Sequence, residues 1–100
     1  MSIFPIEPQL EVYRGSKENL RRRAAEKNAT RHRVAEHVNR LAADNPDELQ
    51  QYHFADIARD LGVPVDEVRS AISDGGYNGI TFGVRRPDRE ALARYKRPSA

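Results

Sequence analysis

The chain has 100 residues, with 17 lysines and arginines against 15 aspartates and glutamates, so its formal net charge is only +2. This length suits one small domain, and a content of 21 Leu, Ile, Val and Phe residues lies just above the level typical of disordered chains. Cysteine is absent, which excludes disulfides and thiolate chemistry, and no apolar run approaches the roughly 20 residues that a membrane helix needs.

The first 15 residues are predicted to form an extended arm. Pro5, Pro8 and Gly15 interrupt a segment whose apolar residues are scattered. The segment also lacks the basic start and continuous apolar centre of a signal peptide, so we expect a cytoplasmic protein. Ser16 follows the arm and can cap a helix that begins after it.

Two helical patterns come next, over residues 17–28 and 30–43. The first is mostly charged and offers little apolar surface for packing. The second carries an apolar stripe at 3.6-residue spacing that includes Val34 and Val38, so it is predicted to pack on the core.

The boundary between these two patterns stays open in the sequence. Residues 17–43 can form one long helix or two, and Asn28 and Arg31 interrupt the apolar stripe, which favours a bend or a break there. The C-terminal end of the second helix is clearer. Asn45 precedes Pro46, and the residue before a proline avoids the helical region of the backbone.

The central part of the chain has the pattern of two short helices that meet at a tight turn. The helices are predicted at about residues 55–61 and 65–74. Gly62 supplies the backbone freedom for the turn, and the small side chain of Ala58 lets the second helix approach closely. The apolar positions that the two crossing helices would share are Ile57, Leu61, Val63, Val68, Ala71 and Ile72.

The segment after these helices favours β-structure. Residues 77–84 combine Thr, Ile, Phe and Val with glycines, and Asn78-Gly79 favours a tight turn. We expect a small β-hairpin or a single strand that pairs with residues 52–54. A short helix is predicted over residues 88–95.

Charge is distributed unevenly along the chain. Residues 14–40 carry nine basic and three acidic residues, residues 41–74 carry two basic and eight acidic ones, and residues 75–100 carry six basic and two acidic ones. This basic–acidic–basic order favours a polyanionic partner held by the flanks, although a solvated helix surface can carry similar charges.

Residues 30–86 resemble a winged helix-turn-helix domain of small bacterial and phage regulators. The resemblance rests on Ala58, Gly62 and their apolar neighbours, and on residues 80–84 as the wing strand. It implies a mainly α fold with a small β-wing, in a domain of residues 16–86 between an arm of residues 1–15 and a C-terminal helix and tail of residues 87–100. It also implies double-stranded DNA as partner, a role in transcription regulation, and a homodimer on a palindromic or repeated site.

The expected DNA contacts follow from the resemblance and from the basic residues. Arg69, on the second helix of the motif, is the expected base reader, because arginine pairs well with guanine. Arg85 and Arg86 would reach a minor groove from the end of the wing. The other candidates for base or phosphate contacts are Ser70, Ser73, Arg21, Arg22, Arg23, Arg31 and Arg33.

The second helix departs from the usual reading head of this family. Asp66, Glu67 and Asp74 are three of its six outward residues, and their carboxylates would face phosphate repulsion. The two in the first turn also suit a helix dipole, which is a purely structural explanation. One alternative is therefore a protein-binding winged-helix adaptor or assembly subunit that uses the acidic surface of residues 44–74. Another is an architectural or recombination accessory protein that binds DNA mainly through wing and arms.

Catalytic and metal chemistry have little support in the sequence. His32 and His37 are five residues apart, on different faces of a helix, and a zinc site without cysteine has no visible frame. We therefore expect no enzyme activity, no metal or other cofactor and no small-molecule ligand.

Overall fold

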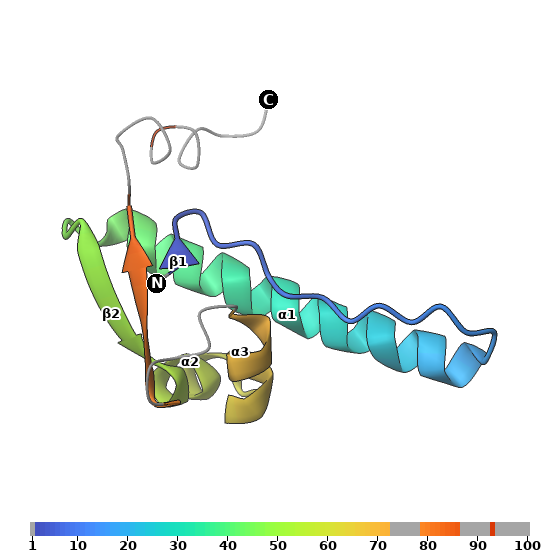
Figure 1. Cartoon of the computed structure of the whole chain (residues 1–100). Coiled ribbons are helices and arrows are strands. Elements are labelled where there is room, and N and C mark those ends of the chain that lie inside the picture. Colours follow the sequence, from blue (N-terminus) through green and yellow to red (C-terminus); the bar gives the residue numbers. More distant parts are fainter. Residues whose placement is uncertain (1, 73–78, 87–92, 94–100) are drawn as a thin grey trace.

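A computed structural model gives the fold of residues 2–72, 79–86 and 93, which are the described part of the chain. Its elements in chain order are β1 (Ser2–Ile3), α1 (Glu18–Asp44), β2 (Leu49–His53), α2 (Phe54–Leu61), α3 (Val65–Ala71) and β3 (Thr81–Arg85). Figure 1 shows the sheet beside the C-terminal half of α1, with α2 and α3 beneath the same helix. The fold is therefore mixed α/β, with helices and one small sheet, and the predicted helix over residues 88–95 lies almost wholly outside the described residues.

For residues 17–43 the sequence allowed either one helix or two, and the structure has a single helix there, α1. Of the bend or break favoured at Asn28 and Arg31, the break is wrong, because α1 runs through both residues and their side chains bond to the N-terminal arm. Asn28 exchanges two hydrogen bonds with the backbone of Glu11, and Arg31 donates to the carbonyl oxygen of Gln9. The polar interruption in the apolar stripe marks the place where the arm crosses the helix.

The two ends of α1 differ in how well they were predicted. The cap expected from Ser16 is wrong, since the helix begins at Glu18 and the N-cap position is Lys17, which makes no side-chain capping bond. The C-terminal end matches the prediction, with Asn45 in an extended conformation directly before Pro46.

The turn between α2 and α3 has the predicted glycine conformation. Gly62 has φ +67°, in the left-handed region that other L-residues resist. Its N–H donates to the Arg59 carbonyl oxygen at 3.3 Å, and the N–H of Val63 donates to the carbonyl oxygen of Ala58 at 3.0 Å. These two bonds form a Schellman motif, which ends α2 and directs the chain into α3.

The sheet has the order β1-β3-β2. β2 and β3 are antiparallel, with Tyr52 opposite Phe82, which confirms the predicted pairing of residues 52–54 with the following β segment. Within the described residues that segment is a single strand. The sequence did not predict β1, which pairs in parallel with β3 and places Ser2 opposite Val84.

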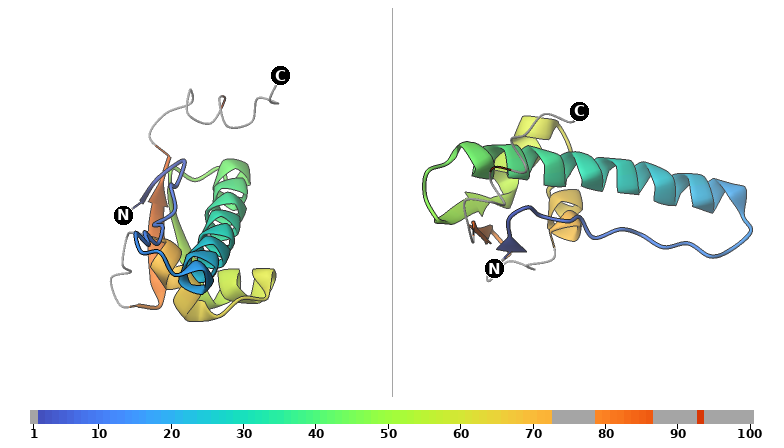
Figure 2. Two further views of the ribbon diagram at one scale, coloured as in Figure 1. Left: turned by 90° about the vertical axis from the view of Figure 1, so that its right-hand side faces the viewer. Right: turned by 90° about the horizontal axis from the view of Figure 1, so that it is seen from above.

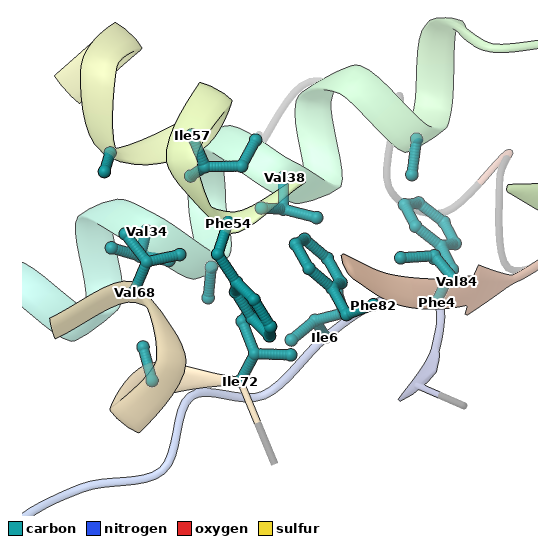
Figure 3. Packing of buried hydrophobic residues seen from close by; sticks show 14 of the residues in the cluster. Phe4, Ile6, Val34, Val38, Phe54, Ile57, Val68, Ile72, Phe82 and Val84 are labelled. Atoms are coloured by element: carbon teal, nitrogen blue, oxygen red, sulfur yellow. The ribbon is translucent and has the colours of Figure 1, made fainter. Parts of the chain in front are cut away.

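One core joins the helices, the sheet and the arm (Figure 3). Phe54 and Phe82 stack with ring centroids 4.9 Å apart at its centre. Phe4 and Ile6, from the predicted arm, are also buried in it, so the arm is part of the folded unit. Of the six apolar positions predicted for the helix pair, four are buried and two lie partly buried against the core; they are Ile57, Val68, Ala71, Ile72, Leu61 and Val63.

The N-terminal half of α1 extends beyond this core. All the buried residues of α1 lie between Arg31 and Ala43, so residues 18–30, about 20 Å of helix, lie outside the buried part of the helix. The right view in Figure 2 and the view in Figure 1 show the arm running back along this projecting half of α1. Within the described residues no helix combines the length and the apolar character needed to cross a membrane.

Candidate nucleic-acid interface

α3 presents a polar outer face. Val68 and Ala71 point into the core, whereas Asp66, Arg69 and Ser70 are exposed. With Glu67, these three residues are the described part of the six-residue face that the sequence assigned to the major groove; Ser73 and Asp74 lie outside the described residues.

The guanidinium group of Arg69 is held in place by three contacts. Its Nε donates to the carbonyl oxygen of Gly79 at 2.8 Å, and its Nη1 donates to a carboxylate oxygen of Asp66 at 2.8 Å. The group also lies 5.9 Å from the centre of the Phe54 ring. Arg69 thus connects α3 to the start of β3, and its pairing offsets the charge of Asp66.

Glu67, the second carboxylate in the first turn of α3, is turned toward α1. Its Oε2 lies 4.0 Å from Nε of Arg31, and its side chain is only 27% exposed. The acidic first turn of α3 therefore presents one carboxylate, that of Asp66, rather than two on its outer surface.

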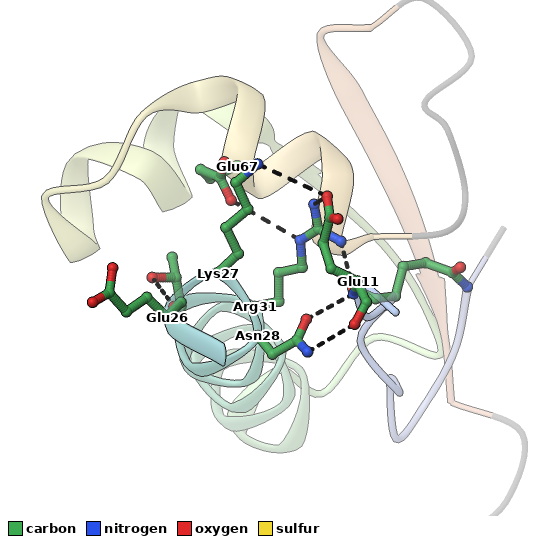
Figure 4. A network of polar contacts seen from close by, with 8 residues as sticks. Glu11, Glu26, Lys27, Asn28, Arg31 and Glu67 are labelled. Atoms are coloured by element: carbon green, nitrogen blue, oxygen red, sulfur yellow. Dashed lines mark hydrogen bonds and ion pairs between the residues drawn. The ribbon is translucent and has the colours of Figure 1, made fainter. Parts of the chain in front are cut away.

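Arg31 lies at the centre of a network between α1, α3 and the arm (Figure 4). Its side chain is 10% exposed, and it donates to the carbonyl oxygen of Gln9 at 3.2 Å and to a carboxylate oxygen of Glu11 at 3.3 Å. Lys27, one turn earlier on α1, lies 3.9 Å from the same oxygen of Glu11. The sequence placed Arg31 among the phosphate contacts but gave no signal for the roles of Glu11 and Lys27, since the arm and the helix are joined only in the fold.

The projecting half of α1 carries the cluster of basic residues that the sequence singled out. Arg21, Arg22 and Arg23 are all exposed on consecutive positions, and Nη2 of Arg21 donates to the carbonyl oxygen of Gly15 at 3.3 Å. Arg33 lies farther along α1 and donates to the carbonyl oxygen at Leu61, at the C-terminal end of α2, over 3.4 Å.

Arg85 and Arg86 differ in their surroundings although they are neighbours in sequence. Arg85 is exposed at the end of β3. The guanidinium group of Arg86 donates to the carbonyl oxygens of Asn45 at 2.7 Å and Pro46 at 3.0 Å, where α1 ends. Cations are favourable at a helix C-terminus, so these bonds give Arg86 a structural role.

The fold separates the predicted contact residues into two groups. Arg69 bonds to Gly79, just before β3 begins, whereas Arg85 lies at the other end of that strand, about 13 Å beyond Thr81. The structure therefore does not join Arg69 with Arg85 and Arg86 in one face. It does bring the first turn of α3 against α1 at Arg31, the residue at which the projecting part of α1 meets the core.

Comparisons of the chain with protein-family models, with curated proteins and with solved structures find no match.

Proposed function

We propose that this chain binds double-stranded DNA and acts as a small transcriptional regulator of the winged helix-turn-helix type. In this proposal α3 enters the major groove and the projecting half of α1 follows the phosphate backbone. Two copies would occupy a palindromic or repeated site, as helix-turn-helix dimers do.

The observation that carries the proposal is the pair of helices α2 and α3 with their tight turn, together with the way in which the carboxylates of α3 are paired. α2 and α3 meet at a left-handed glycine turn, and the order α1, β2, α2, α3, β3 is compatible with a winged helix-turn-helix domain. The acidic first turn of α3 argued against a groove-binding role. That objection is weaker in the fold, because Glu67 faces Arg31 and Asp66 is paired with Arg69.

The projecting half of α1 supports the proposed contact with phosphates. Lysine and arginine supply most of the affinity for DNA that does not depend on sequence. Arg22 and Arg23 are exposed there, and among the described residues neither guanidinium group forms a hydrogen bond or an ion pair. We assign the main phosphate contacts to this segment rather than to Arg85 and Arg86.

The first test removes two of these charges. Arg22→Ala/Arg23→Ala should weaken binding to a random duplex and lower the slope of log K against log salt by about 1–2, since each lost phosphate contact contributes about 0.9. Fluorescence anisotropy over a salt series measures both quantities.

Arg40→Ala/Arg85→Ala is the matched control, because it removes the same charge near the C-terminal end of α1. It should change the slope little. A larger loss in this control would place the phosphate contacts at that end. If the wild type does not bind duplex even at low salt, the adaptor that uses the acidic surface of residues 44–74 is the better proposal.

A further inference from the structure

We propose that Lys27 and Arg31 form a binding site for a DNA phosphate, and that the carboxylate of Glu11 occupies this site when DNA is absent. The inference rests on the proposed function and adds an internal competitor to it. It also gives the arm a role in setting the affinity for DNA.

The geometry resembles a phosphate site occupied by a carboxylate. One oxygen of Glu11, Oε1, contacts both Nη2 of Arg31 at 3.3 Å and Nζ of Lys27 at 3.9 Å (Figure 4). Glu11, Arg23 and Lys27 also line one shallow hollow of about 260 Å³ between the arm and α1. A phosphate oxygen at the position of Glu11 Oε1 would meet the same two cations, and the hollow beside Lys27 gives access to it.

The carboxylate is held weakly and can be displaced without moving the arm. Both of its contacts are long and involve one oxygen, and the side chain of Glu11 is 42% exposed, so solvent screens the pairs. The backbone of Glu11, in contrast, is fixed by two bonds to the Asn28 side chain, at 2.7 and 3.0 Å. The side chain can therefore rotate away while its backbone stays on α1.

The guanidinium group of Arg31 has unused capacity for an anion. Its Nε is buried and forms no hydrogen bond among the described residues, with the carboxylate of Glu67 4.0 Å away. Arginine favours phosphate because its planar fork can donate two bonds at once. Here Nη1 and Nη2 each make one long bond, to Gln9 and to Glu11.

The position of the site fits a duplex on α3. Glu67 belongs to the first turn of α3 and lies against Arg31, so the site is directly beside the helix proposed for the major groove. With Glu11 in place, the negative charges of Glu11 and Glu67 offset the positive charges of Arg31 and Lys27. When Glu11 rotates away, the group has a net positive charge next to α3.

The experiment compares Glu11→Gln with Glu26→Gln, an equal change of charge at an exposed neighbour of Lys27 on α1. We expect Glu11→Gln to bind a random duplex at least about 3-fold more tightly than Glu26→Gln at about 50 mM salt, with a slope of log K against log salt that is steeper by about 0.9. Lys27→Ala should remove this gain in the Glu11→Gln background. It should weaken the wild type less, because there Glu11 already engages the lysine.

The possible outcomes separate this inference from the proposed function. If the wild type binds duplex but Glu11→Gln and Glu26→Gln are equal, or if Lys27→Ala leaves the gain intact, the phosphate site is overturned and DNA binding stands. If no variant binds duplex at low salt, both proposals are overturned. Circular dichroism melting of each variant confirms that the compared proteins are folded.

Discussion

At the scale of single residues, identical side chains have different roles in this molecule. Arg85 and Arg86 are adjacent and carry the same charge. Arg85 is exposed, whereas Arg86 bonds to carbonyl oxygens at the end of α1. Arg31 likewise differs from Arg22 and Arg23, because its guanidinium group is paired with the carboxylate of Glu11. A count of basic residues therefore overestimates the number that are free to contact a phosphate.

The two neighbouring arginines give a matched test. Arg86→Ala should lower the free energy of unfolding by about 2 kcal/mol, because it removes charged hydrogen bonds to carbonyl oxygens at a helix end. Arg85→Ala should stay within about 0.5 kcal/mol of the wild type, as exposed substitutions usually do. Urea unfolding measures both, and equal losses would show that the bonds of Arg86 add nothing to stability.

The residues that the sequence identified best are those with a local role. Gly62 was predictable because a tight turn between two helices needs a left-handed residue, and its φ of +67° agrees. Arg86 was not predictable in the same way. Its partners lie about 40 positions earlier in the chain, and no pattern near Arg86 indicates them.

At the scale of elements, the least expected feature is the joining of the arm to α1 and the sheet. Helix pairs and their turn are local, so sequence periodicity predicted α2 and the start of α3 well, although α3 ends at Ala71 and not at residue 74. The parallel pairing of β1 with β3 links the two ends of the chain, and a two-residue strand has no periodicity to detect. The prediction of a helix break near Asn28 was wrong for a related reason, because its polar side chain bonds to the distant arm and does not mark a helix end.

The attachment of the arm can be tested at Asn28. Asn28→Ala removes both bonds to the Glu11 backbone, so the Glu11 amide should exchange with solvent at least about 10-fold faster through local opening. The Ile6 amide, which donates to the buried Asn39 side chain at 2.7 Å, should keep its protection and serves as the internal control. Unchanged exchange at Glu11 would mean that other contacts hold this part of the arm.

At the scale of the whole molecule, the long helix α1 connects the hydrophobic core to a basic surface. α1 packs on the core with its C-terminal half and carries exposed arginines on its projecting half, beside the arm, while α3 meets it at Arg31. The basic and acidic segments seen in the sequence therefore occupy different parts of the fold. Their uneven distribution was predictable, whereas the placement of the basic segment next to α3 required the tertiary structure.

The most direct test of the account is an NMR titration of the full chain with a duplex at low salt. If α3 and the projecting half of α1 face the same duplex, the amide signals of Ser70 and of residues 21–27 should shift together, while those of Leu49 and Arg85 stay unchanged. Shifts confined to the end of the sheet at Leu49 and Arg85, or no shifts on addition of duplex, would contradict it.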